Sequence, residues 1–272
     1  MVDAAFLDSR VLAVLEEGRQ AIAIRELADE SVDVAGGTMS YAGPGVWANQ
    51  VCGIGLHGPI SDADLDRIVE FYDARDEPGE IELAAHADAS CFRGLATRGF
   101  YCKEIESVFA IDGQRHVVET PTLDRLADLG LEMSRITARG DAAQDFVEVG
   151  TRGSHTTGKP ANPAERKLLH RVIAHPRTAA WLVRFEGEIC GVTAMECAGE
   201  VACLFATTVT PKFRCRGIQR ALIEARLRHG LDEGCRYVCM HSAAGLATER
   251  NARRTSMELC YSKAVLTRVR PS

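Results

Sequence analysis

Short apolar runs separated by polar turns dominate the second half of the chain. Three such runs lie within residues 179–185, 189–195 and 201–209, and the turns between them contain Glu and Gly. The runs are rich in β-branched and apolar residues, which is typical of strands, and short turns join neighbouring strands in antiparallel pairs. The pattern therefore predicts an antiparallel meander of three strands.

The spacing of apolar residues changes after the third run. Apolar positions between Ile218 and Ala225 recur at intervals of three and four, which predicts a helix with one face for the sheet. Residues 236–242 read as the next strand, parallel to the third because a helix crosses between them. A short helix near residues 248–259 and a final strand near residues 260–269 are predicted to follow.

Earlier residues supply the start of the same unit. Residues 131–137 read as its first strand, and residues 141–150 and 163–174 read as two helices. The polar run between Thr151 and Pro163 is either a mobile loop near a substrate entrance or a solvated connection. The order of elements predicts an α/β (α+β) unit from residue 131 to the C-terminus.

The loop between the third strand and the following helix carries the clearest candidate chemistry. It runs from Val209 to Gln219 as VTPKFRCRGIQ. The first backbone N–H groups of a helix have no partner within it and lie at the positive end of its dipole, so they can bind a phosphate. Gly217 has no Cβ and lets the backbone approach a ligand, while Arg214 and Arg216 add charge-assisted hydrogen bonds. The loop predicts a phosphate site, and the alternative is an ordinary turn with solvated arginines.

The same stretch resembles the acyl-CoA-binding motif of the GNAT acetyltransferase superfamily. It reads Val-x-Pro-x-x-Arg-x-x-Gly-Ile-x-x-Ala-Leu from Val209 to Leu222, and it departs from the family pattern at Gln219, where the family has Gly or Ala. The predicted order of elements is also that of the GNAT core. The resemblance implies a GNAT-like mixed, mostly antiparallel sheet flanked by helices, with this loop holding the pyrophosphate of CoA.

The resemblance also implies an activity and a set of cofactor contacts. The chain would be a GNAT-type N-acetyltransferase, an acyltransferase that moves an acetyl group from acetyl-CoA to a primary amine of a small molecule by direct attack. Its third strand would part from residues 236–242, so that a freed backbone N–H polarises the thioester carbonyl. The implied cofactor-binding residues are Thr207, Thr208, Val209, Arg214, Cys215, Arg216, Gly217, Ile218, Gln219 and Asn251. Arg254, on the same predicted helix as Asn251, could also reach the cofactor, and a solvated helix face is the alternative for both.

The first half of the chain repeats the pattern of the second more faintly. A shift of 157 residues lays Leu65 on Leu222, and four further residues of shift lay Val108 on Val269. Identities are few, so the match is one of pattern, and chance is the alternative. The interpretation is a tandem of two GNAT-like units with a degenerate first copy.

The equivalent loop in the first half lacks the features that bind phosphate. The run HGPISD at residues 57–62 contains no arginine. Its Ser61 or Asp62 would cap the next helix and occupy the N–H groups that a phosphate needs, so this half is predicted not to bind CoA. The predicted domains are a degenerate GNAT-like domain at residues 1–115, a linker at residues 116–127 and an acyl-CoA-binding GNAT domain at residues 128–272.

Candidate catalytic residues follow from what the third strand lacks. Many GNAT enzymes carry an acidic residue there to deprotonate the amine, and residues 201–209 contain none. The candidate bases are His241, whose residue type titrates near neutrality, and Glu200 in the preceding turn. Their alternatives are a strand-end histidine bonded to a neighbour and a solvated glutamate. Ser256 stands where the family has a tyrosine that protonates the leaving thiolate, and a solvated or helix-bonded serine is its alternative.

Cysteine and histidine also occur close together in the sequence. Cys235, Cys239 and His241 are ligand types that zinc accepts, but no fourth ligand is evident, so no metal site is predicted. Cys203 or Cys239 with His241 would make a nucleophile pair, although buried cysteine serves more often as a small apolar residue. The alternative to an acetyltransferase is a catalytically weak CoA-binding or interaction protein.

Charge is distributed unevenly along the chain. The 272 residues are 46% hydrophobic and carry a net charge of −6. From Lys212 onward there are 13 Lys and Arg against 5 Asp and Glu, a net of +8, which leaves −14 for the first 211 residues. The basic part coincides with the predicted cofactor loop and would attract a polyanionic cofactor. Its interspersed apolar residues and the acidic total argue against nucleic acid as a partner.

Composition also indicates the cellular setting. No apolar run reaches the length of about 20 residues that a membrane span needs, and the N-terminus has no secretory pattern. Ten cysteines without framework spacing read as reduced thiols of a cytoplasmic protein. The predicted partner is a small-molecule amine, with neither nucleic acid nor a membrane, and a homodimer is left open. An amino acid, a polyamine, an aminoglycoside and a protein N-terminus all fit as acceptors.

Overall fold

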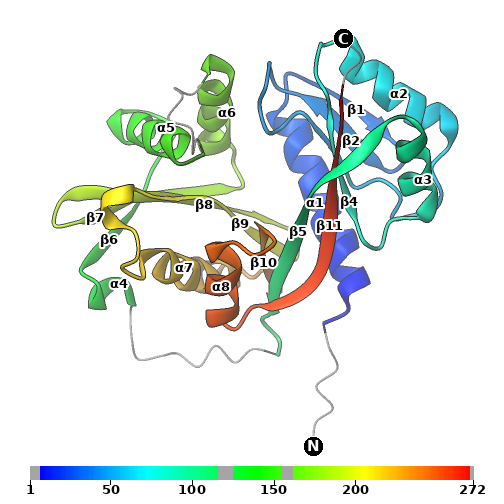
Figure 1. Ribbon diagram of the computed structural model, residues 1–272. Coiled ribbons are helices and arrows are strands. Elements are labelled where there is room, and N and C mark those ends of the chain that lie inside the picture. The colour runs from blue at the N-terminus through cyan, green and yellow to red at the C-terminus, as the bar shows by residue number, and fades with distance from the viewer. Residues whose placement is uncertain (1–6, 116–124, 155–161, 270–272) are drawn as a thin grey trace, which may run out of the picture. The chain divides into compact units, whose positions relative to one another are not determined.

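The computed structural model describes residues 7–115, 125–154 and 162–269 (Figure 1). These residues form two compact units that are interleaved in sequence. The predicted linker, residues 116–127, lies mostly outside the described residues, and the predicted domain boundaries stay a prediction. Within the described ranges, the first unit holds residues up to 108, residues 242–244 and residues from 259, and the second holds residues 109–241 and 245–258.

The first unit is a sheet with helices on it. Its strands follow the order β1-β2-β3-β4-β11-β5, and β3 and β4 are parallel while the β1·β2, β2·β3 and β4·β11 pairs are antiparallel. The elements are α1 (Ser9–Leu27), β1 (Glu30–Val34), β2 (Gly37–Tyr41), β3 (Gln50–Cys52), α2 (Asp62–Asp73), β4 (Glu80–Ala84), α3 (Ala89–Thr97), β5 (Phe100–Asp112) and β11 (Glu258–Arg268).

The last strand, β11, pairs antiparallel with β4 of the first unit. The sequence places this strand in the predicted domain 128–272, whereas the contacts place it in the first unit from Leu259 onward. Two sets of contacts explain its position. Leu266 joins the apolar core of the first unit. On the other face the buried Lys263 ammonium lies 3.0 Å from Glu17 Oε1 and 2.9 Å from Glu82 Oε2.

The second unit contains the predicted meander. β6 to β9 pair antiparallel in sequence order, and β9 pairs parallel with β10, as predicted. The sheet order is β10-β9-β8-β7-β6. The elements are α4 (Arg125–Asp128), β6 (Leu131–Arg135), α5 (Asp141–Ser154), α6 (Pro163–Ala174), β7 (Thr178–Phe185), β8 (Glu188–Ala198), β9 (Val201–Val209), the 3-10 helix η1 (Pro211–Phe213), α7 (Ile218–Asp232), β10 (Tyr237–Ala243) and α8 (Ala247–Arg254).

Helices cover both faces of the second sheet. α5 and α6 lie on one face and α7 on the other (Figure 1). Ile223 and Leu227 of α7 pack in one apolar cluster with Leu204 and Met240 of the strands. The helix approaches closely at Gly230, where a Cβ would lie 3.0 Å from side-chain atoms of Ala202 and Val238. This packing fixes the start of α7 at the end of β9, where the predicted phosphate loop lies.

The two halves share an order of elements. The series α2, β4, α3, β5 corresponds to the series α7, β10, α8, β11, and in both halves a helix crosses between two parallel strands. The result is a mixed, mostly antiparallel architecture flanked by helices, as predicted. Within the described residues, no helix combines the length and the apolar character needed to cross a membrane.

Candidate active site

Helix α7 begins without a side-chain cap. Gly217 is its N-cap residue, in a left-handed conformation with φ 80° and ψ 0°, and this cap makes no side-chain hydrogen bond to the first turn. The equivalent helix of the other half, α2, differs, because the Ser61 hydroxyl accepts a hydrogen bond of 3.1 Å from the Asp64 N–H at its start. The predicted cap at Ser61 is therefore confirmed. The N–H groups at the start of α7 are left for an anionic ligand.

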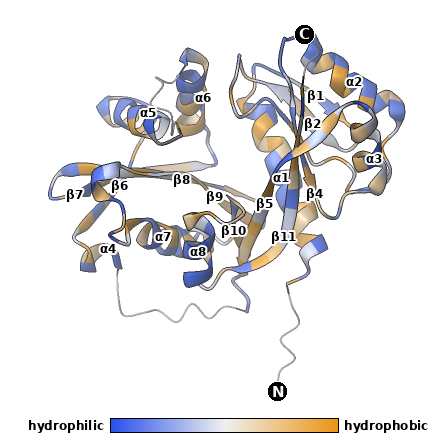
Figure 2. Cartoon of the chain, viewed as in Figure 1, coloured by the Kyte–Doolittle hydropathy of each residue, from blue (hydrophilic) through white to orange (hydrophobic). Residues whose placement is uncertain are grey.

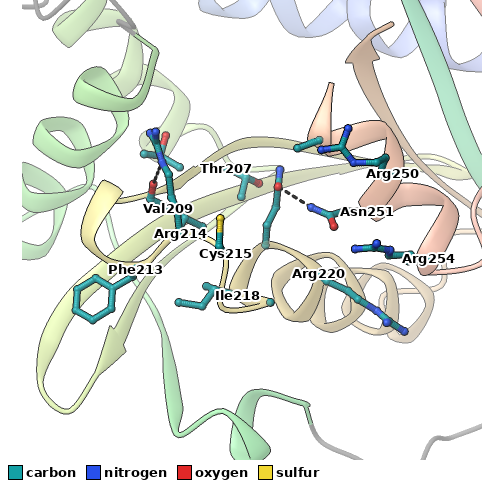
Figure 3. A pocket seen from close by; sticks show the side chains of 14 residues that line it. Thr207, Val209, Phe213, Arg214, Cys215, Ile218, Arg220, Arg250, Asn251 and Arg254 are labelled. Carbon is teal, nitrogen blue, oxygen red and sulfur yellow. Dashed lines mark hydrogen bonds between the residues drawn. The ribbon is translucent and has the colours of Figure 1, made fainter. Parts of the chain in front are cut away.

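A cavity of about 520 Å³ opens at this helix start (Figure 3). Its size falls within the range of small-molecule sites, about 300–1,000 Å³. All the predicted cofactor residues except Arg216 line it. The lining residues are Thr207, Thr208, Val209, Phe213, Arg214, Cys215, Gly217, Ile218, Gln219, Arg220, Ala247, Arg250, Asn251 and Arg254.

The two arginines of the loop point in different directions. Arg214 lines the cavity, and its Nε donates a hydrogen bond of 3.2 Å to the Val209 carbonyl. Arg216 lies over aromatic rings instead, with its guanidinium 5.4 Å from the centre of the Phe213 ring. Cys215 between them has φ 62°, so the chain turns there. A contact between Arg216 and the cofactor stays a prediction, and the geometry favours Arg214.

The cavity is strongly cationic. Among the described residues that line it, four are arginines and none is acidic. Arg220 donates to Glu224 at 2.8 Å, whereas the exposed Arg250 and Arg254 make no ion pair within the described part of the chain. α8, which carries them, is mostly hydrophilic (Figure 2). A polyanion in this cavity would meet uncompensated positive charge.

Sequence reasoning missed four of the lining residues, namely Phe213, Arg220, Ala247 and Arg250. The sequence did contain one sign that α8 carries a cationic face. Arg250 and Arg254 are four residues apart, which puts them on one helix face. The position of that face relative to α7 is a long-range property that spacing does not reveal.

Gln219 joins the two helices that flank the cavity. The Asn251 amide Nδ2 donates to Gln219 Oε1 at 2.7 Å, and Gln219 Nε2 donates to the Thr248 hydroxyl at 3.2 Å. The side chain that departs from the family motif is therefore turned toward α8 and held there. It also fixes the position of Asn251, another predicted cofactor residue.

β9 parts from β10 beside the cavity. The parallel pairing runs from Val201 opposite Tyr237 only as far as Leu204 opposite Met240. β9 continues to Val209, paired with β8 alone. Because alternate N–H groups of a strand point to opposite sides, some N–H groups beyond Leu204 face away from β8 with no β10 carbonyl opposite them. The predicted parting of the two strands is confirmed.

None of the three predicted catalytic residues lines the cavity. His241 is half-buried on β10, one residue past the last β9–β10 pair. Glu200 is exposed at the far end of β9. At a rise of about 3.3 Å per residue it lies roughly 20 Å along the strand from Thr207, which does not favour it as the base. Ser256 is exposed after α8, with φ 61°.

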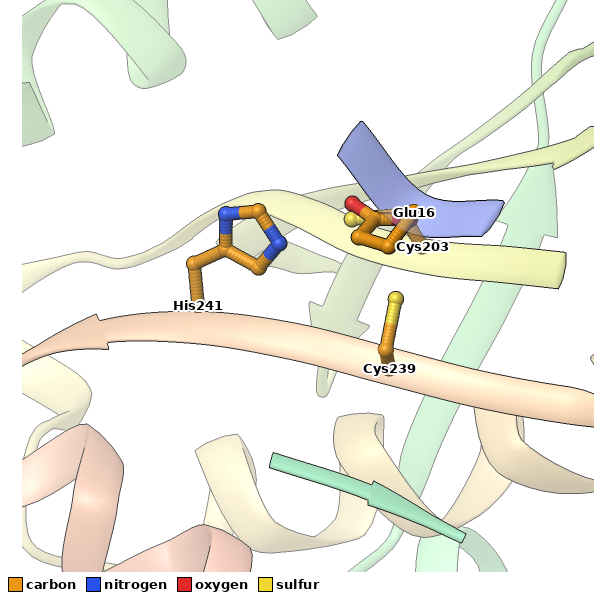
Figure 4. Close-up of side chains that lie close together, drawn as sticks. All are labelled: Glu16, Cys203, Cys239 and His241. Carbon is orange, nitrogen blue, oxygen red and sulfur yellow. The ribbon is translucent and has the colours of Figure 1, made fainter. Parts of the chain in front are cut away.

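His241 shares a sheet face with two cysteines (Figure 4). Cys203 and Cys239 are paired opposite each other on β9 and β10, and donor atoms of these cysteines and His241 lie within 4.8 Å of one another. Zinc in structural sites takes four ligands. Within the described residues of the second unit, no fourth His, Cys, Asp or Glu lies in that range, and Glu16, also drawn in the figure, belongs to the first unit.

Comparison with known proteins places this site in a family. Residues 151–252 match the acetyltransferase (GNAT) family. That stretch includes the predicted phosphate loop, α7 and most of α8. A comparison with curated proteins gave no match.

Three solved structures share the fold at low sequence identity. The GCN5-related N-acetyltransferase from Kribbella flavida has a TM-score of 0.66 and 16% identity, covering 98% of this chain and 98% of that chain. The GCN5-related N-acetyltransferase from Sphaerobacter thermophilus has a TM-score of 0.55 and 17% identity, and the match covers 82% of this chain and 73% of that chain. A tandem GNAT protein from the clavulanic acid biosynthesis pathway has a TM-score of 0.53 and 15% identity, and the match covers 87% of this chain and 74% of that chain.

The family match and the cavity coincide in the second unit. The matched stretch contains every lining residue except Arg254. The chain therefore carries, at residues 151–252, a stretch that matches the acetyltransferase (GNAT) family, and this match supports a transferase of the acyltransferase class.

Proposed function

We propose that the second unit binds acetyl-CoA and transfers its acetyl group to a primary amine of a small molecule by direct attack. The observation that carries the proposal is the cationic, acid-free cavity at the uncapped start of α7. CoA carries a pyrophosphate and a 3′-phosphate, and four arginines with a helix N-terminus match that charge. α7 has 15 residues, enough for an appreciable dipole at its first turn.

The pyrophosphate would bind the N–H groups that follow Gly217, with Arg214 beside them. From there the pantetheine arm would run along the cavity between α7 and α8, past Asn251. The amide side chain of Asn251 is held by Gln219, so it is oriented before a ligand arrives. A prepositioned partner loses less conformational freedom on binding.

The thioester would lie where β9 has parted from β10. A backbone N–H in the segment Thr207 to Val209 would donate to the carbonyl oxygen as negative charge develops there. A donor placed in this way contributes about 2.7–4 kcal/mol to the barrier in other enzymes. The thiolate that leaves has an ordinary pKa of about 8.5, so it needs little assistance from an acid. Ser256, which is exposed and does not line the cavity, therefore has no part in the proposal.

The amine must lose a proton before it attacks. With an ammonium pKa near 10, only about one molecule in a thousand is neutral at pH 7, so a base is useful. His241 is our candidate, because it follows the last β9–β10 pair directly. Its side chain is on the sheet face opposite Met240, which packs against α7. The amine would then approach the thioester from the face away from α7.

The competing function is a catalytically weak CoA-binding protein, and the lack of a carboxylate on β9 favours it. The discriminating experiment is a melting scan with acetyl-CoA, followed by detection of free thiol with a panel of amines. Stabilisation together with amine-dependent thiol release supports the transferase. Stabilisation without thiol release for any amine would support the binding protein, and the absence of stabilisation would contradict both.

A further inference from the structure

Arg226 is a buried cation in the core of the second unit. It lies on α7 and is 1% exposed. Within the part of the chain that the structure describes, it makes no ion pair with a carboxylate. Burial lowers the pKa of its guanidinium to about 9, which still leaves it charged at neutral pH. An unpaired buried charge costs folding free energy, so its position calls for an explanation.

Backbone carbonyl groups take the place of a counter-ion. Arg226 Nε donates to the Leu222 carbonyl of its own helix at 3.0 Å. Its Nη1 donates to the Ala194 carbonyl of β8 at 2.7 Å and to the Phe205 carbonyl of β9 at 3.2 Å. One guanidinium nitrogen therefore links the two strands.

The two carbonyls lie at the edge of a bulge. Ala194 is opposite Phe205, but the next regular pair is Val192 opposite Thr208. Two residues of β9, Ala206 and Thr207, thus face the single residue Thr193. This count defines a β-bulge, which bends the strand and re-aims the residues after it.

The bulge holds a strained residue. Ala206 has φ 49°, a left-handed conformation that a residue with a Cβ adopts at a cost. The hydroxyls of Thr193 and Thr207 share a hydrogen bond of 2.9 Å across it. A strained conformation persists only where the surrounding contacts hold it, and Arg226 binds the carbonyl directly before Ala206.

The strand beyond the bulge forms the cavity wall. Thr207, Thr208 and Val209 line the cavity, and their N–H groups are the ones that the proposed function assigns to the thioester. If the bulge relaxed into a regular ladder, the register would slip by one residue and every later side chain and N–H would change sides. The orientation of this segment therefore depends on the bulge.

We propose that Arg226 is a positioning residue: it holds the β9 bulge in the shape that presents the backbone N–H groups of residues 207–209 to the thioester carbonyl. The inference rests on the proposed function, because it assumes that acetyl-CoA binds in this cavity. Arg226 is about two helix turns or more from the predicted phosphate loop, so its loss should affect the thioester end of the cofactor and not the phosphate end.

The carbonyl stretching frequency of bound acetyl-CoA provides a test that needs no amine. Acetyl-CoA labelled with carbon-13 at the acetyl carbonyl is added to the full chain, and the infrared difference spectrum is recorded. A carbonyl that accepts a stronger hydrogen bond in the site than water supplies absorbs at lower frequency than the same group in water. Arg226→Met is expected to lose most of this shift while the dissociation constant for acetyl-CoA stays within about threefold.

Two further variants make the result decisive. Arg226→Lys keeps the charge, but an ammonium group cannot reproduce the geometry in which the guanidinium donates to the Leu222, Ala194 and Phe205 carbonyls at once. An intermediate frequency shift is therefore expected. Arg228→Met is the matched control, because Arg228 lies on the same helix and is exposed, and it should leave the shift unchanged. Melting temperatures of all variants show that the folded protein is being compared.

The outcomes separate this inference from the proposed function. An unchanged shift in folded Arg226→Met would overturn the positioning role while leaving acetyl-CoA binding intact. If Arg226→Met does not fold, Arg226→Lys decides, and a full wild-type shift there would overturn the role as well. If the wild-type protein does not bind labelled acetyl-CoA, the proposed function fails and this inference fails with it.

Discussion

The Asn251 side-chain amide donates a hydrogen bond of 2.7 Å to Gln219 Oε1, which ties α8 to the first turn of α7 across the cavity. Gln219 replaces the small residue of the GNAT motif. Its side chain points toward α8 and also donates to Thr248, so it does not project over the loop. The departure from the motif supplies a contact between the two helices that flank the site.

Loss of this contact should weaken cofactor binding. We predict that Gln219→Ala reduces acetyl-CoA affinity by about 3–10-fold, because a hydrogen bond is worth about 1 kcal/mol and Asn251 loses its orientation. Calorimetry on Gln219→Ala, Asn251→Ala and the double variant measures the coupling, which should make the double variant less affected than the sum of the single ones. Additive losses would show that the two residues act independently, and tighter binding by Gln219→Ala would contradict the predicted loss.

The arginines of α8 should act through their charge. Arg250→Gln and Arg254→Gln are each expected to weaken acetyl-CoA binding by about 3–10-fold at low salt, with a smaller effect at high salt, because screening reduces exposed interactions. Arg253→Gln is the control, since Arg253 is paired with Glu249 at 3.0 Å and does not line the cavity. Equal losses in all three variants would indicate a general charge effect and not a site.

His241 is testable by the pH dependence of turnover once an amine is known. An unperturbed histidine has a pKa of about 6.5, so kcat/KM should rise with pH through a limb that His241→Ala removes. Turnover should fall by about 10²–10⁴-fold while acetyl-CoA affinity is kept. Glu200→Gln should have little effect because Glu200 lies at the far end of β9. A limb that persists in His241→Ala would assign the proton transfer to water or another group.

Acid should destabilise the second unit at Asp112. Burial favours a higher pKa for this carboxyl, but hydrogen bonds from the Arg236 guanidinium and the Gln114 N–H outweigh it, so the pKa is lowered overall. A carboxyl whose pKa is lower in the folded state stabilises the fold above its unfolded pKa and loses that contribution as pH falls. The free energy of unfolding should therefore decrease below about pH 4.

Urea denaturation at a series of pH values checks this expectation, with Asp112→Asn as the comparison. The variant lacks the titrating group, so the difference in stability between it and the wild type should shrink as the pH falls. A difference that stays constant with pH would contradict the assignment to Asp112.

Local patterns in the sequence predicted local structure well. The meander from β7 to β9, the amphipathic α7 and the cap at Ser61 follow from periodicity and hydrogen-bonding chemistry over a few residues. The part of the cavity that residues 207–219 form was predicted for the same reason, because the strand, the loop and the helix start are adjacent in sequence. The family match at residues 151–252 confirms the superfamily that this motif indicated.

Long-range relationships were not available from the sequence. The alternation of apolar residues in β11 predicts a strand, but it does not say that the strand pairs with β4, which lies far earlier in the sequence. The different directions of Arg214 and Arg216 depend on the left-handed turn at Cys215. The bulge at Ala206 adds a single residue to one strand, and its partner Arg226 is recognisable only when the helix is placed on the sheet.

The central claim is that the uncapped start of α7 holds the phosphates of acetyl-CoA, and calorimetry on Gly217→Glu tests it most directly. The substitution puts a side chain and a negative charge at the predicted phosphate position. Gly187→Glu is the control, since Gly187 has the same φ of 80° and, like Gly217, room for a Cβ without a close contact, in the turn between β7 and β8. We predict that Gly217→Glu loses at least about 100-fold in acetyl-CoA affinity through repulsion and lost N–H contacts, while Gly187→Glu binds as the wild type does. Unchanged affinity in a folded Gly217→Glu protein would contradict the account.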